Sequence, residues 1–162
     1  MSRPFAVAAL VLTLAAPAWA EEKNQIPDDL RAVLEKADKF ELLSLSPERL
    51  KEKPKDAFHG WKVLGQTTVT AADRDRLVPA FAKGVADNSG VVAACFNPRH
   101  GIRATRGGKT AEFVICFECF QVHAYRGDKK EDDSFLITAS PQPTFDAVLK
   151  AAKVPLAGEE KK

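Results

Sequence analysis

All three cysteines of this sequence and two of its three histidines lie in one short stretch. Thiolate and imidazole are the ligands that zinc prefers, and three sulfurs with one nitrogen make a common closed tetrahedral set. The segments ACFNPRHG and ICFECFQVH therefore indicate a zinc site. Its expected ligands are Cys95, His100, Cys116 and Cys119, with His123 as the alternative nitrogen ligand.

Two other chemistries are open to the same cysteines. Cysteines usually pair in an oxidising compartment, and three of them would give one disulfide, with Cys95 bridged to Cys119 or Cys116, and one free thiol. The protein would then be a disulfide-clipped, non-catalytic binding module of the cell envelope. A Cys-x-x-Cys motif can also be redox-active, although that motif normally lies at a helix N-terminus. Here the flanking β-branched and aromatic residues predict a strand instead. Covalent haem attachment is disfavoured, because Phe120 stands where a CxxCH motif requires histidine.

Two charged side chains lie beside these ligands. Arg99 could hold a carboxylate or phosphate of a partner by two hydrogen bonds, or simply face solvent. Glu118 would serve as a general base only if a bound metal kept an open coordination position, which four protein ligands do not leave. The sequence also contains no nucleophile elbow, HExxH motif or phosphate-binding glycine loop. The residues therefore indicate a binding protein rather than an enzyme, with no catalytic residue assigned.

The first 20 residues predict the compartment. Arg3 precedes the short apolar run FAVAALVLTLAAPA, and AWA at residues 18–20 is a small-x-small cleavage pattern. The apolar run is shorter than the roughly 20 residues that a membrane helix needs. Residues 1–20 are therefore expected to be a cleaved signal peptide, with the protein exported to the periplasm or beyond the cell. No integral membrane segment is expected after cleavage.

Charge and size exclude some classes of partner and organisation. The formal net charge is +2, without a basic block, so nucleic acid is not expected as a partner. A protein or a small molecule is left open. After signal cleavage the chain has the length of one domain. The expected organisation is an N-terminal segment with one helix at 21–39, a single domain at 40–156 and a charged tail at 157–162.

Hydrophobic periodicity and turn residues predict the elements that must position the site. The expected class is α+β, with an antiparallel sheet of about five strands and helices packed on one face. Thr70 is an N-cap candidate, and the glycines of RGGKT suit a tight hairpin turn. A turn centred on those glycines pairs Cys95 with Phe120, whereas a bulge within residues 98–101 would set Cys95 opposite Cys119. Helices are predicted at 26–40, 71–87 and 144–155, and strands at 40–48, 61–70, 91–96, 112–125 and 134–140.

Three segments together carry a resemblance. FHGWKVLG (58–65), ACFNPRHGIR (94–103) and ICFEC (115–119) resemble a group of small exported bacterial proteins of unassigned function. The resemblance extends over roughly residues 40–155. It implies that the cysteine-bearing segments and the PRHG run belong to one site, and it implies no particular activity, fold or cofactor.

Overall fold

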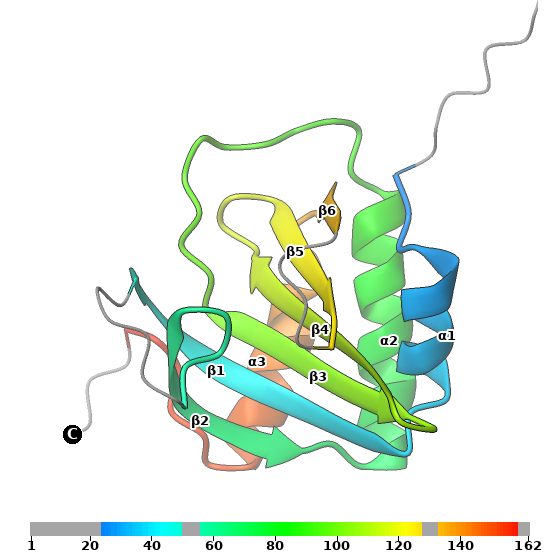
Figure 1. Ribbon diagram of the computed structural model, residues 1–162. Helices are drawn as coiled ribbons and strands as arrows, with labels where there is room; N and C mark the ends of the chain where they lie inside the picture. The colour runs from blue at the N-terminus through cyan, green and yellow to red at the C-terminus, as the bar shows by residue number, and fades with distance from the viewer. Residues whose placement is uncertain (1–23, 50–55, 128–132, 159–162) are drawn as a thin grey trace, which may run out of the picture.

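In the described residues, six strands form one antiparallel sheet and three helices lie along one of its faces (Figure 1). The structure is a computed structural model, and it describes residues 24–49, 56–127 and 133–158. The predicted α+β class is confirmed, with six strands where about five were expected. The helices are α1 (Asp28–Glu35), α2 (Ala71–Ala86) and α3 (Gln142–Ala151), and the strands are β1 (Lys39–Arg49), β2 (Trp61–Thr68), β3 (His100–Arg106), β4 (Lys109–Cys116), β5 (Gln121–Arg126) and β6 (Asp133–Leu136).

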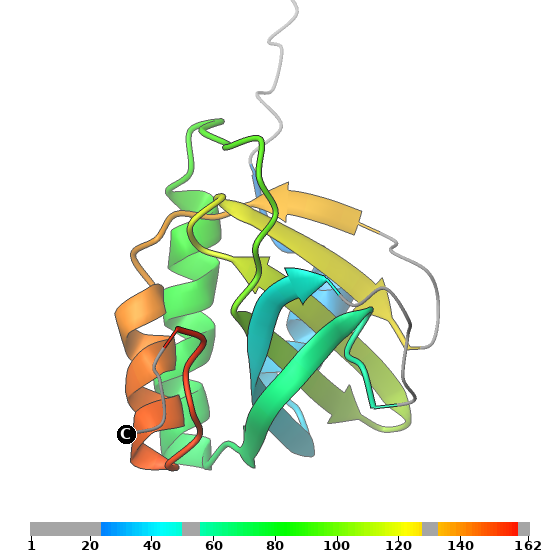
Figure 2. The same cartoon turned by 90° about the vertical axis from the view of Figure 1, so that its left-hand side faces the viewer.

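The strand order across the sheet is β2-β1-β3-β4-β5-β6. The sheet carries buried apolar side chains on both of its faces. Apolar side chains of the three helices pack on one, here called the helix face, and Figure 2 shows α2 and α3 side by side there. A smaller apolar cluster covers the opposite face, here called the outer face. It contains Leu43, Leu45, Phe58, Trp61, Val114 and Tyr125.

Local sequence signals explain two elements directly. Thr70 caps α2, because its hydroxyl accepts the backbone N–H of Asp73 over 3.1 Å. The hairpin between β3 and β4 turns at Gly107 and Gly108, whose φ angles of 52° and 77° lie in the region that glycine adopts without steric cost. Both features were predicted from the sequence, and both are confirmed.

The segments that carry the cysteines differ from the predicted strands. Residues 91–96 form a loop, so Cys95 precedes β3, and both predicted positions of Cys95 within the hairpin are wrong. The stretch 112–125 is two strands separated by a turn at residues 117–120. Cys116 ends β4 and Cys119 lies in that turn, so the Cys-x-x-Cys motif spans a hairpin turn rather than one strand.

Other boundaries differ by a few residues. The first helix ends at Glu35 because the chain enters β1 at Lys39, and α3 begins two residues before the predicted cap at Thr144. Strand β1 continues through Pro47, which lacks an N–H donor. This is tolerated because the pairing of β1 with β3 ends at Ser44. The expected signal peptide at residues 1–20 and most of the expected charged tail lie outside the described residues.

Candidate functional site

The three sulfurs lie together at the end of the sheet where β4 turns into β5. Cys116, the last residue of β4, and Cys119, within the turn, form a disulfide with their Cα atoms 5.2 Å apart. The predicted bridge from Cys95 to Cys119 or Cys116 is therefore wrong for this structure, in which Cys95 is the free thiol. The third sulfur comes from the loop that joins α2 to β3, and the Cys95 thiol donates to Cys119 Sγ over 2.8 Å. The disulfide sulfurs belong to fully buried residues, whereas Cys95 is only partly buried. Within this cluster, Cys95 is therefore the one cysteine that is not fully buried.

Backbone hydrogen bonds fix the loop of Cys95 against the turn. The N–H of Ala93 donates to the carbonyl oxygen of Cys119 over 3.1 Å, and Gln121 Nε2 donates to the carbonyl oxygen of Ala93 over 2.9 Å. Two N–H groups also point at sulfur, since Asn97 donates to Cys119 Sγ over 3.3 Å and Cys119 donates to Cys116 Sγ over 3.1 Å. These two hydrogen bonds hold the loop of Cys95 and the turn against the disulfide.

The turn itself depends on an unusual backbone conformation. Phe120 has a φ of 60°, which is uncommon for a residue other than glycine. Its carbonyl oxygen accepts the N–H of Ile137 over 3.1 Å, and that bond links the turn to the segment after β6. The Cys-x-x-Cys turn is therefore held from both sides, by the loop of Cys95 and by the chain leading to α3.

The structure does not bring His100 to the sulfurs. His100 lies opposite Ile115 across the β3–β4 pair, and both side chains face the helices. Cys116 follows Ile115 and turns to the other face, because side chains alternate along a strand. His100 is 3% exposed, and its Nε2 lies 2.8 Å from Asp146 Oδ1 of α3. Its ring also makes edge contacts with the ring of Phe117.

Asp146, the hydrogen-bond partner of His100, has a lowered pKa. Burial by itself raises the pKa of Asp146, but the hydrogen bond and charge of His100, together with smaller contributions from Lys150 and Gln142, outweigh it, so the pKa lies below its ordinary value. Sequence reasoning did not find this pair, because Asp146 is distant in the chain and matches no motif. The pair joins β3 to α3, which makes it a structural contact of the helix face.

His123, the alternative nitrogen ligand, lies on the outer face. It is opposite Val114 in the β4–β5 pair, and Val114 belongs to the outer-face cluster. The His123 ring stacks on Phe96, with ring centroids 3.9 Å apart, and Phe96 directly follows Cys95. Of the two candidate histidines, His123 is therefore the one on the same side of the sheet as Cys116.

Arg99 and Glu118 form an ion pair beside the turn. Arg99 Nη2 lies 3.4 Å from Glu118 Oε2, and both side chains are about half exposed. They line a cavity of about 320 Å³ between the Cys-x-x-Cys turn and the start of α3, together with Asn97 and Gln142. Arg99 can thus meet an anionic group of a partner next to the disulfide, at the expense of a weak surface ion pair.

A second polar cluster on the outer face was also missed from the sequence. His59 Nε2 lies 2.9 Å from Glu112 Oε2, and Arg103 Nε donates to the other oxygen over 2.5 Å. Burial alone raises the pKa of Glu112, but these two partners outweigh it and hold the pKa below its ordinary value. The His59 ring stacks on Tyr125 with centroids 3.6 Å apart. The cluster fastens the segment before β2 to the sheet. The sequence signal for it is the alternation of side chains along β4, which puts Glu112 on the same face as Val114.

Within the described ranges, no set of three or more Cys, His, Asp or Glu side chains is arranged to hold a metal ion. Two of the sulfurs are bonded to each other, and a sulfur in a disulfide is not a thiolate ligand. The described helices are all too short or too polar to span a membrane. In this state the site is a disulfide with a thiol beside it, so thiol–disulfide exchange is the chemistry its sulfurs can perform directly.

Comparison with known proteins identifies no family. No family model matches the chain, and no curated protein matches it. One solved structure, a protein of Clostridium perfringens provisionally described as a lipoprotein, aligns with 76% of this chain and 92% of its own. The sequence identity is 14% and the TM-score is 0.46, so this likeness supports no functional conclusion.

Proposed function

We propose that the protein is an exported thiol–disulfide exchange module, in which Cys95 reacts with the Cys116–Cys119 disulfide. The observation that carries this proposal is the distance of 2.8 Å between Cys95 Sγ and Cys119 Sγ, within a loop held by backbone hydrogen bonds. Thiols and disulfides exchange when a thiolate attacks a disulfide sulfur. Export, which the first 20 residues predict, supplies a compartment in which disulfides persist.

The first step is an internal rearrangement without net oxidation. The Cys95 thiol gives its proton to solvent, and the thiolate attacks Cys119 Sγ. The Cys95–Cys119 bond forms while the Cys116–Cys119 bond breaks, and the electron pair leaves on Cys116 Sγ, which takes a proton from solvent. The N–H of Cys119 already donates to Cys116 Sγ, so it stabilises the leaving thiolate.

The second step involves a partner that carries two thiols. One partner thiolate attacks Cys95 Sγ of the Cys95–Cys119 bond and expels the Cys119 thiolate. The second partner thiol then displaces Cys95, so the partner gains a disulfide and this protein gains two electrons and two protons. Cys95 is the point of contact because it is the partly exposed cysteine. Arg99, beside the turn, suits an acidic group near the partner's thiols.

The proposal predicts how fast the buried disulfide is reduced. Dithiothreitol reaches the buried Cys116–Cys119 bond only through local opening of the structure. After the rearrangement the disulfide joins Cys95 to Cys119, and dithiothreitol can attack it at Cys95. Cys95→Ser should therefore slow reduction at least about tenfold relative to the wild type. Ala94→Ser, which changes the neighbouring exposed residue, should leave the rate unchanged. Rates are followed by alkylation and mass spectrometry, with circular dichroism confirming that each variant is folded. Equal rates for the wild type and Cys95→Ser would show that the disulfide is only a static clip of a non-catalytic binding module.

Metal binding by the reduced cluster is a second candidate. The convergence of three sulfurs favours it, because reduction would leave three thiols on one site, and thiolate is a preferred zinc ligand. The position of His123 on the sulfur side supports it as the fourth ligand in place of His100. Native mass spectrometry of the reduced protein with zinc tests this candidate. His123→Ala should lose the zinc and His100→Ala should retain it, and an absence of bound zinc in the reduced wild type would remove the candidate.

A further inference from the structure

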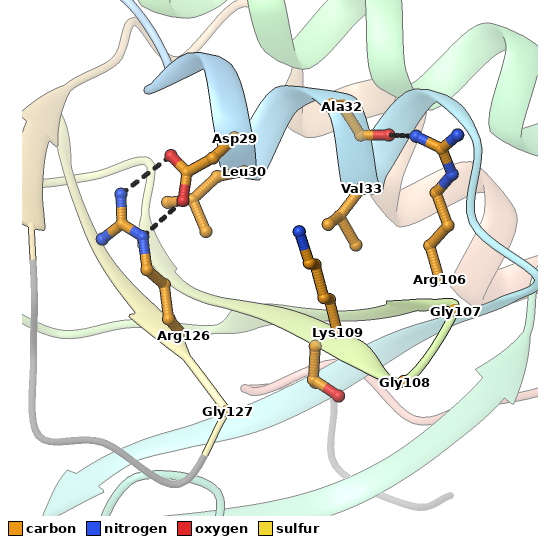
Figure 3. Close-up of a pocket in the computed structure, with 11 residues that line it drawn as sticks. Asp29, Leu30, Ala32, Val33, Arg106, Gly107, Gly108, Lys109, Arg126 and Gly127 are labelled. Carbon is orange, nitrogen blue, oxygen red and sulfur yellow. Dashed lines mark hydrogen bonds and ion pairs between the residues drawn. The ribbon is translucent and has the colours of Figure 1, made fainter.

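A cavity lies between α1 and the β3–β4 hairpin, at the opposite end of β4 from Cys116 (Figure 3). Its volume is about 710 Å³, which is in the usual range for small-molecule sites. Leu30 and Val33 of α1 line it with apolar atoms, and the hairpin glycines Gly107 and Gly108 border it. A Cβ on either glycine would meet no atom within 4 Å, so the border at the turn is open.

Two basic side chains define the charge of the cavity. Arg106 and Lys109 are paired across the hairpin, so both side chains extend toward the same face, over α1. Figure 3 shows the Lys109 ammonium directed into the cavity between Leu30 and Val33. Arg106 donates one N–H to the carbonyl oxygen of Ala32 over 3.3 Å, which leaves donors of its guanidinium available. Among the described residues, Lys109 has no hydrogen-bond or ion-pair partner.

The acids near the cavity are already engaged. Arg126 holds both oxygens of Asp29, at 2.6 and 2.9 Å, and these hydrogen bonds keep the pKa of Asp29 below its ordinary value. Asp133 accepts another N–H of the same guanidinium over 2.5 Å. Asp38 lies behind the turn and accepts the N–H of Gly107 over 2.8 Å. The donors that remain for a ligand are therefore those of Lys109 and Arg106.

We propose that this cavity binds a small organic anion with one acidic headgroup and an apolar body. The headgroup, a carboxylate or a phosphate monoester, lies between Lys109 and Arg106. The apolar body covers Leu30 and Val33. An acidic headgroup matches the two available cationic groups, and an apolar body matches the aliphatic lining from α1. This inference is independent of the cysteine chemistry.

The test is a titration of the isotope-labelled protein followed by NMR. The probes are hexanoate and hexyl phosphate, which distinguish the two headgroups, with hexanol and inorganic phosphate as probes that lack one part of the ligand. At least one of the two anions should shift the amide signals of Gly107, Gly108 and Lys109 in a saturable way. Hexanol and inorganic phosphate should each bind at least about tenfold more weakly than that anion.

Two lysine variants test whether Lys109 contacts the anion. Lys109→Met keeps the length of the side chain and removes its charge, and it should weaken the anion at least about tenfold. Lys62→Met is the matched control, because Lys62 is an exposed lysine of β2 far from the hairpin, and it should bind as the wild type does. Unchanged affinity in Lys109→Met would overturn the proposal, as would hexanol or inorganic phosphate binding as tightly as the anions. Unchanged spectra with every probe would overturn it as well.

Discussion

Gly101, in the PRHG run, has no space for a side chain. Its position in β3 lies between Leu43 and Val114, on the outer face that Phe58 covers. A Cβ at Gly101 would lie 2.8 Å from Phe58 Cε1 and 3.1 Å from Cδ1. The ring cannot move outward freely, because Phe58 is 2% exposed and the Arg103 guanidinium lies over it at 5.1 Å. We therefore expect Gly101→Ala to displace Phe58 and loosen the segment that it anchors.

The size of the effect follows from two opposing contributions. Replacing glycine in a strand stabilises the fold by about 0.5–1 kcal/mol, because the unfolded chain loses freedom. Overpacking a well-filled site costs about 1–3 kcal/mol. The clash should prevail, so Gly101→Ala should lower the free energy of unfolding by about 1–2 kcal/mol. Urea unfolding followed by circular dichroism measures this change.

A double-mutant cycle identifies the cause. Phe58→Leu removes the ring carbon nearest to Gly101, so in that background Gly101→Ala should be close to neutral or slightly stabilising. The coupling between the two substitutions should be at least about 1 kcal/mol, as expected for residues in contact. Additive effects would refute the reasoning, since they would mean that the clash with Phe58 is not what excludes a side chain at this position.

Three further predictions concern the polar pairs and the helix packing. Glu112 and Asp146 have folded-state pKa values below their ordinary values, so each ionised carboxylate stabilises the fold at a pH above the ordinary carboxyl pKa. That stabilisation is lost as the pH falls through the lowered pKa. Glu112→Gln should therefore make the free energy of unfolding depend less on pH on the acid side, and an unchanged dependence would contradict this. Asp146→Ala should destabilise the protein by about 1–3 kcal/mol, because it leaves buried His100 without its hydrogen-bond partner, and a change below about 0.5 kcal/mol in urea unfolding would contradict that. Gly84→Ala should destabilise the protein despite the better helix propensity of alanine, worth about 1 kcal/mol, because its Cβ would overlap the ring of Pro141. A higher melting temperature of the variant would refute the clash.

The predictable parts of the fold are those with a local physical cause. The cap at Thr70 needs only its own hydroxyl and the N–H of Asp73, and the turn at Gly107 and Gly108 needs only residues that accept a positive φ. The turn inside the Cys-x-x-Cys motif was not predictable in this way. Phe120 adopts a positive φ although it is not glycine, and strand-forming residues surround it, so the pattern predicted one continuous strand.

The sequence predicted only part of the candidate site. The grouping of the three cysteines came from their number and spacing, and the structure does bring the three sulfurs together. The assignment of His100 to that group depended on proximity in sequence. In a strand, however, the side chain of the next residue points to the opposite face, and only the register shows that His100 shares the face of Ile115 rather than that of Cys116.

The most direct test of the central claim is the disulfide connectivity of the purified protein, measured by rapid alkylation, proteolysis and mass spectrometry. Two connectivities are predicted, Cys116–Cys119 and Cys95–Cys119, and they should interconvert during incubation without an added oxidant or reductant. Their ratio should return to the same value after either form is enriched. A single connectivity that never changes, with Cys95 remaining as a thiol throughout, would contradict the account.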